Sequence, residues 1–176
     1  PVPDGKIISS TSEALIAAEK IHYPITLKVS DVELLHKTEL GAVMLNINDP
    51  LALEKARQDL FKIGSSLLIE KMVQDSVAEL IIGVGLDPIF GKYIIIGSGG
   101  ILVELFKESI PLLFPVNRED VSLALSKLKV FPIIKGFRGN PEGDVEMIID
   151  CIMATVKLVS ENDIDELDIN PLIVLK

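Results

Sequence analysis

The chain has 176 residues, a formal net charge of −9 and a hydrophobic share of 48%. This length is sufficient for one domain or two small lobes with a buried core, and the acidic balance argues against a nucleic-acid partner, which requires clustered lysine and arginine. No apolar run reaches the roughly 18 residues of a membrane-spanning helix, and a single cysteine, Cys151, excludes a disulfide within the chain. We therefore expect a cytoplasmic protein without a membrane segment.

The first 66 residues are predicted to form a compact α+β lobe. Ser10 and Glu13 stand in capping-box spacing and predict a helix that ends before Pro24. Asp49, followed by Pro50, predicts the start of a second helix. The lobe is completed by strands over 6–10, 24–30 and 42–47, a loop over 31–41 and an end of the second helix at residue 64.

From residue 67 to residue 176 strand-like segments dominate, and we expect a second lobe. The segments are short, rich in β-branched residues and bounded by glycine, which is typical of buried strands. The helix expected near the end has a stripe of apolar residues at helical spacing. The predicted elements are strands over 67–73, 78–86, 92–97 and 166–175 and helices over 119–128 and 144–159.

Lys28 lies in a strand where Ile25, Leu27 and Val29 alternate with polar residues, so it is predicted to face away from the packed side. It is either a solvated surface lysine or a point charge for a phosphate, which needs no bidentate geometry.

The segment Glu70, Lys71, Met72 and Val73 ends the strand that joins the two predicted lobes. Such a junction suits a nucleotide, because backbone groups of a linker can contact an adenine edge while Met72 packs on the ring. Glu79 opens the next strand and is a candidate acceptor for a ribose hydroxyl. The alternatives are an ordinary core methionine and an exposed glutamate at a strand end.

Gly97, Gly99 and Gly100 directly follow a strand, in a segment that continues to Glu104. Glycines there allow close approach of the backbone, and free N–H groups can bind an anion. The segment is neither a P-loop nor a complete dinucleotide-binding motif, and a tight turn is the alternative. Arg138, between two glycines, is either an adaptable anion contact or a loop residue.

Alternation near the end of the chain places Glu166, Asp168 and Asn170 on one face of a strand. Oxygen ligands on one strand suit Mg²⁺, which takes one or two protein groups and completes its shell with phosphate oxygens and water. The alternative is a solvated edge strand.

These segments, in this order, resemble the ATP-grasp domain of ADP-forming (NDP-forming) acyl-CoA synthetases, the group that includes acetate–CoA ligase β subunits. The resemblance covers nearly the whole chain and rests on "PVPDGK", "YPITLKVSDVELLHKTELGAV", "LLIEKMV", "AELIIGVGLDPIFGKYIIIGSGGILVEL" and "ELDINPL". It implies an α+β fold in which two lobes with antiparallel sheets clamp ATP or ADP with Mg²⁺.

The resemblance also implies residue roles. Lys28 contacts a nucleotide phosphate, residues 70–73 form the adenine hinge, Glu79 lies near the ribose, and Asn170 and Asp168 support the metal. His36 matches the family's loop histidine, thought to take up a phosphoryl group. An imidazole titrates near neutrality and is partly an uncharged nucleophile, while Lys37 beside it offsets phosphate charge.

The chain departs from the family pattern at three places. Gly41 is followed by Ala42 where the family usually has a second glycine, and the connector over 48–67 is shorter than usual. The sequence starts at Pro1 and ends at Lys176, where the family continues to a strand with a metal-binding aspartate. We therefore expect a fragment or an impaired nucleotide site.

The leading hypothesis is an acid–CoA ligase (ADP-forming) module that works through phosphohistidine. It would act on acyl-CoA or acyl phosphate and require a CoA-binding α subunit or domain with the partner histidine. The alternatives are a regulatory, non-catalytic ATP-grasp domain of a fused acyltransferase and a structural dimerisation domain.

Overall fold

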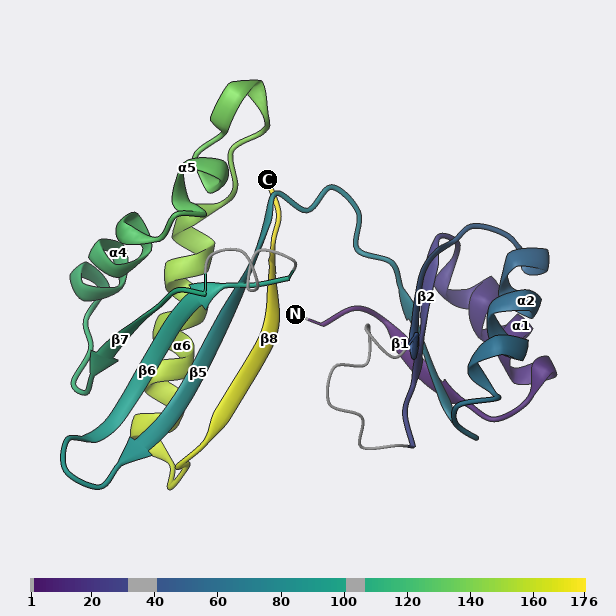
Figure 1. Cartoon of the computed structure of the whole chain (residues 1–176), viewed down its shortest axis with the longest axis horizontal. Coiled ribbons are helices and arrows are strands. Elements are labelled where there is room, and N and C mark those ends of the chain that lie inside the picture. The colour runs from purple at the N-terminus through teal and green to yellow at the C-terminus, as the bar shows by residue number, and fades with distance from the viewer. Residues whose placement is uncertain (1, 32–40, 101–106) are drawn as a thin grey trace. The chain divides into compact units, whose positions relative to one another are not determined.

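The computed structural model describes residues 2–31, 41–100 and 107–176. The chain divides into two compact units, Pro1–Gln74 and Asp75–Lys176. Each unit has one antiparallel four-stranded sheet with helices against one face (Figure 1). The predicted α+β class with antiparallel sheets is thereby confirmed. Among the described residues, no helix combines the length and the apolarity needed to cross a membrane.

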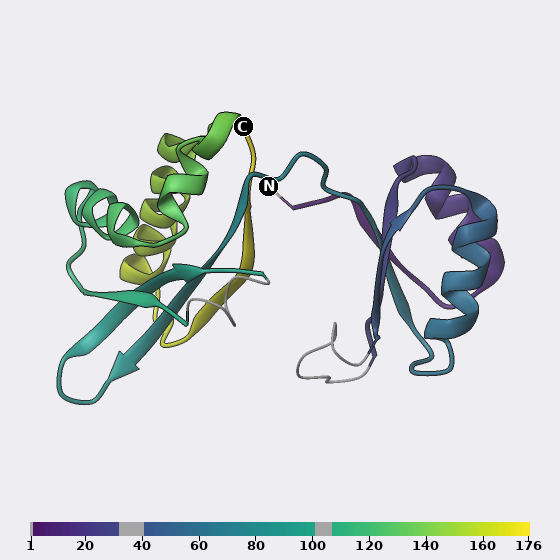
Figure 2. The same ribbon diagram turned by 45° about the horizontal axis from the view of Figure 1, so that its top comes forward.

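The first unit has the strand order β1-β4-β2-β3, with helices α1 and α2 on one face of the sheet (Figure 2). Buried aliphatic side chains of the strands, such as Leu27 and Ile69, form the core together with Ala14 and Leu53 of the helices. The elements are β1 (Gly5–Ile8), α1 (Thr11–Ile21), β2 (Ile25–Val29), β3 (Val43–Ile47), α2 (Pro50–Leu60) and β4 (Leu67–Lys71).

Strand β4 belongs to the first unit because it pairs with both β1 and β2. The predicted boundary after residue 66 falls before this strand, whereas the structure divides the chain after Gln74. Composition changes at residue 67, but pairing with strands far back in the sequence decides where β4 lies. The linker between the units therefore follows the segment 70–73.

Local sequence signals account for the helix starts. The Ser10 side chain accepts a hydrogen bond from the Glu13 N–H, and Asp49 caps α2, as predicted. Helix α2 ends at Leu60 and not at residue 64, where the sequence placed it. The N–H of Gly64 still bonds to the Leu60 carbonyl, in a short turn beyond the helix.

The second unit has the order β7-β6-β5-β8, and α4 and α6 cover one face of its sheet (Figure 1). The apolar stripe of α6, including Ile148, Ile152 and Val156, is buried in the core as expected. The elements are β5 (Ala78–Asp87), β6 (Gly91–Ser98), β7 (Ser109–Leu113), α4 (Arg118–Lys127), α5 (Phe131–Ile134), the 3₁₀ turn η1 (Phe137–Gly139), α6 (Val145–Glu161) and β8 (Leu167–Val174).

Two short elements, β7 and α5, were not predicted. Pro111 lies inside β7, and a proline argues against a strand unless that strand is at an edge, which is where β7 lies. Helix α5 has only four residues, too few for a helical period to be visible in sequence.

Candidate functional site

Lys28 lies on the face of the first sheet opposite the helices. Ile25, Leu27 and Val29 are completely buried on the helix side, so the predicted orientation of Lys28 is confirmed. Its ammonium forms an ion pair with the carboxylate of Glu70 on β4. The Lys28 side chain is 41% exposed, and a pair this accessible contributes at most about 1 kcal/mol to stability. The charge of Lys28 can therefore be redirected to a ligand at little cost to the fold.

The segment that follows Glu70 is held by the turn between α1 and β2. The Lys71 ammonium donates to the His22 carbonyl over 2.8 Å and to the Tyr23 carbonyl over 3.3 Å. The N–H of Met72 donates to the Pro24 carbonyl over 3.0 Å. Residues 71 and 72 of the predicted hinge are thus held by hydrogen bonds to residues 22–24 in the absence of a ligand.

The sulfur of Met72 has a polar contact. The hydroxyl of Thr26, which is 4% exposed, donates to the Met72 sulfur over 3.0 Å. Met72 and Val73 are both half-buried. The first unit therefore brings together Lys28, Glu70 and Met72 around Thr26, as the hinge hypothesis requires, and leaves part of Met72 accessible.

The glycine-rich segment packs against the start of β5. The Gly99 N–H donates to the Glu79 carbonyl over 2.8 Å, and a Cβ added to Gly99 would lie 2.9 Å from backbone atoms of Glu79 and Leu80. Gly100 has a left-handed φ of +58°, and a Cβ there would collide with the Glu79 carboxylate. Close backbone packing accounts for these glycines, while anion binding stays a prediction.

Glu108 is a residue that the sequence did not single out. Its carboxylate accepts from the Lys129 N–H over 2.6 Å and from the Ser98 hydroxyl over 3.3 Å. Its main-chain carbonyl oxygen would be only 2.8 Å from a Cβ added to Gly97. Glu108 therefore ties the end of β6 to the segment after α4. No motif could have identified it, because its partners lie 10 and 21 residues away in sequence.

The predicted alternation in β8 is confirmed. Asp168 and Asn170 are exposed, whereas Leu167 and Ile169 pack against the core. Glu166, just before the strand, is also exposed.

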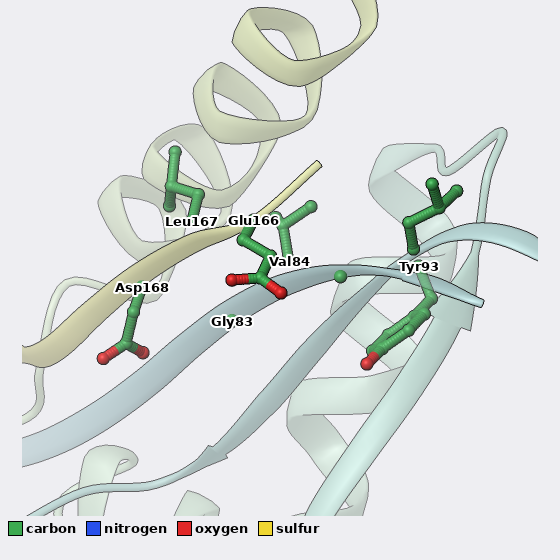
Figure 3. A pocket seen from close by; sticks show the side chains of 8 residues that line it. Gly83, Val84, Tyr93, Glu166, Leu167 and Asp168 are labelled. Carbon is green, nitrogen blue, oxygen red and sulfur yellow. The ribbon is translucent and has the colours of Figure 1, made fainter. Parts of the chain in front are cut away.

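The open face of the second sheet contains a hollow of about 460 Å³. Gly83 and Gly85 are among the residues that line it, and the carboxylates of Glu166 and Asp168 lie on one side (Figure 3). Tyr93 lines the opposite side, and a Cβ added to Gly85 would collide with the Tyr93 hydroxyl group. The sequence did not predict this hollow, since it arises from the register that pairs Gly85 with Tyr93.

Asp168 and Asn170 are the two predicted metal-binding residues. Within residues 2–31, 41–100 and 107–176, no cluster of three or more His, Cys, Asp or Glu side chains exists that could hold a metal ion alone. Mg²⁺ binds through one or two protein groups and completes its coordination with phosphate oxygens and water. Two oxygen-bearing side chains on one strand face fit that pattern.

Four predicted residues are not brought to these sites by the described structure. His36, Lys37 and Glu104 lie outside the described residues. Arg138 lies in η1, which packs on α5, and its guanidinium stands over the Phe137 ring at 5.2 Å. No hydrogen bond or ion pair connects Arg138 to the described part of the glycine-rich segment.

The fold of the chain consists of two antiparallel sheets, each with helices on one face, and this fold agrees with the family that its sequence matches. A family model described as "ATP-grasp domain" matches residues 1–176. The chain therefore belongs to the ATP-grasp domain family, and its similar relatives are ADP-forming acetate–CoA ligases. It is 35% identical to the subunit beta of acetate–CoA ligase [ADP-forming] II from Pyrococcus furiosus, over 100% of this chain and 79% of that subunit.

A second relative is a much longer protein than this chain. The 4-hydroxybutyrate–CoA ligase [ADP-forming] of Nitrosopumilus maritimus is 32% identical over 100% of this chain but only 26% of its own length. The chain thus spans most of a beta subunit and about a quarter of this ligase.

Solved structures agree with the family. An acetyl-coenzyme A synthetase 1 of Ca. Korarchaeum cryptofilum, in complex with coenzyme A and Ca-AMPCP, matches with a TM-score of 0.89 and 28% identity over 99% of this chain and 80% of that one. Another structure of that enzyme contains coenzyme A and Mg-AMPPCP, with a phosphohistidine segment pointing towards the nucleotide binding site. It matches with a TM-score of 0.82 and 29% identity, over 99% of this chain and 79% of that chain.

Proposed function

We propose that this chain is the nucleotide-binding part of an ADP-forming acyl-CoA synthetase. The complete reaction is acyl-CoA + ADP + phosphate ⇌ carboxylic acid + CoA + ATP. The full-length match to the ATP-grasp family and the names of the relatives support this assignment. A CoA-binding α subunit or domain with a partner histidine would supply acyl phosphate or acyl-CoA.

One observation of the structure carries the nucleotide role. Lys28 and Glu70 stand on the sheet face that the helices leave uncovered, and Glu70 directly precedes the segment 71–73, which leads into the linker between the units. An ammonium beside a linker can bind a phosphate as a point charge while the linker contacts the base. In this proposal Lys28 binds the nucleotide phosphates, and Met72 and Val73 contact the adenine.

The second unit would supply the metal ligands. Asp168 and Asn170 would hold Mg²⁺ together with phosphate oxygens of the nucleotide, and the bound ion would neutralise phosphate charge. The Glu79 carboxylate, beside Gly100, is proposed to accept from a ribose hydroxyl. Because the Gly99 N–H is bonded to the Glu79 carbonyl, the backbone at Gly100 is the part of the segment proposed to bind phosphate oxygens.

His36 is proposed as the phosphoryl relay. A neutral imidazole nitrogen attacks the γ-phosphorus of ATP, the bond from that phosphorus to the β,γ-bridging oxygen breaks, and ADP leaves. The other imidazole nitrogen releases its proton to solvent, which leaves a neutral ring with the phosphoryl group attached. Lys37 would offset the phosphoryl charge, since phosphoryl transfer depends mostly on positioning and electrostatics. In synthesis of ATP the same steps run in reverse.

The two histidines of the chain provide a matched test. Protein is incubated with Mg²⁺ and γ-labelled ATP, with and without the CoA-binding partner. We expect an acid-labile, base-stable label on the wild type and on His22→Ala, and none on His36→Ala. Thermal stabilisation by ATP without any label would support a regulatory nucleotide-binding domain instead. The absence of both label and stabilisation would overturn the nucleotide assignment and favour a structural role.

A further inference from the structure

Lys71 is bound differently from Lys28, although both are lysines near the proposed nucleotide contacts. Lys28 pairs with a carboxylate on the uncovered face of the sheet. The Lys71 ammonium instead donates to two main-chain carbonyls, those of His22 and Tyr23. Its positive charge is therefore directed at the segment that joins α1 to β2, 48 and 49 residues earlier in the sequence.

The position that Lys71 occupies favours a cation. His22 is the C-terminal cap of α1, and the carbonyl groups at a helix C-terminus carry a partial negative charge. His22 has a left-handed φ of 65°, so the chain turns sharply where the ammonium binds. A charge-assisted hydrogen bond is about twice as strong as a neutral one, and it holds this turn in place against β4.

The same turn also holds the residues that follow Lys71. The Pro24 carbonyl accepts from the Met72 N–H, and Thr26 donates to the Met72 sulfur. Residues 71 and 72 are thus joined to one short segment by their side chains and by the main chain. Any loosening of that segment must change where Met72 and the next residue lie.

We infer that Lys71 is a positioning residue that fixes the base-binding segment through the turn at residues 22–24, and that it does not bind phosphate. This inference rests on the proposed function, since it assumes that Met72 and Val73 contact the nucleotide base. Lys28 recognises phosphate, whereas Lys71 aligns the segment that recognises the base.

The two roles predict different ligand selectivity. Loss of a phosphate-binding lysine should weaken ATP and inorganic tripolyphosphate alike, because both ligands present a chain of three phosphates. Loss of a base-positioning lysine should weaken ATP only. For Lys71→Met we expect the Kd of Mg-ATP to rise by about tenfold, while the Kd of Mg-tripolyphosphate changes by less than about twofold.

Four variants complete the design, with both Kd values measured by calorimetry. Lys71→Arg should retain ATP affinity, because a guanidinium also donates to carbonyls. Lys28→Met should weaken both ligands. Lys62→Met is the matched control and should change neither, since Lys62 is exposed and its ion pair among the described residues is with Asp59, on the same short segment. Lys71→Gln, which keeps a donor without the charge, replaces Lys71→Met if that variant does not fold.

The outcomes separate the inference from the function on which it depends. Equal weakening of both ligands in Lys71→Met would make Lys71 a phosphate contact, and a lowered Tm with unchanged Kd values would make it only structural. Either result overturns the inference and leaves the nucleotide assignment intact. If the folded wild type binds neither ligand, the proposed function itself fails and the inference falls with it.

Discussion

Replacing Gly99 by alanine tests how closely the glycine-rich segment approaches β5. A Cβ at this position would lie 2.9 Å from three backbone atoms, the carbonyl carbon of Glu79 and the nitrogen and carbonyl carbon of Leu80. Backbone atoms cannot rotate away as a side chain can, so the two segments must separate. Separation would also stretch the 2.8 Å hydrogen bond from the Gly99 N–H to the Glu79 carbonyl.

The expected cost follows from these two effects. Overpacking costs about 1 to 3 kcal/mol, and a weakened buried hydrogen bond about 1 kcal/mol. We expect Gly99→Ala to lower the free energy of unfolding of the second unit by about 2 to 4 kcal/mol. Gly83→Ala is the matched control, because its Cβ would meet only the Ile95 side chain. That side chain can change rotamer, so we expect a cost below about 1.5 kcal/mol.

The assay uses the two tyrosines of the chain, which has no tryptophan. Tyr23 lies in the first unit and Tyr93 in the second, so in a Tyr23→Phe background the tyrosine fluorescence reports only the second unit. Urea unfolding then gives the stability of that unit in each variant. A loss for Gly99→Ala no larger than that for Gly83→Ala would refute the close approach of the backbones.

Three further predictions concern single contacts. Hydrogen bonds from the Ser65 hydroxyl and from the Ser65 N–H hold the pKa of Asp31 below its usual value. The resulting stabilisation is present above the unfolded pKa of about 3.9 and is lost as pH falls through the lower folded pKa. The Tm difference between wild type and Asp31→Asn, measured by calorimetry, should therefore shrink below about pH 4. Met72→Leu should cost about 1 kcal/mol in urea unfolding by leaving the buried Thr26 hydroxyl without its acceptor, and adding Thr26→Val should recover most of that loss. Ile152→Ala in the core should cost about 2 to 5 kcal/mol in the same assay, and a smaller loss would mean that the core collapses around the change.

Patterns local to one strand or helix could be predicted from the sequence. Alternation with a period of two placed Lys28 opposite the core and Asp168 on the exposed face of β8, because successive side chains of a strand point to opposite sides. Capping residues such as Ser10 and Asp49 marked helix starts, since they bond to N–H groups only three residues away.

Features that depend on pairing could not be predicted. Strand β4 reads like the strands that follow it, yet it pairs with β1 and β2, which precede it. The hollow beside Asp168 requires Tyr93 to lie opposite Gly85, a register that neither strand specifies alone. Lys71 was interpreted through its neighbours in the hinge motif, whereas its ammonium contacts lie in another segment.

The residues that hold the predicted functional segments share one kind of contact. Lys71 lies in the hinge, Glu108 bonds to the residue before Gly99, and Asp31 directly precedes the segment that contains His36. Each is a charged side chain bonded to the main chain of a segment 49, 21 or 34 residues away, respectively. Hydrogen bonds to charged groups are stronger than those between neutral groups, and these three form without any ligand. A motif records residues that are expected to contact a ligand. These three side chains instead bond to main-chain groups far away in sequence, so the sequence did not predict their contacts.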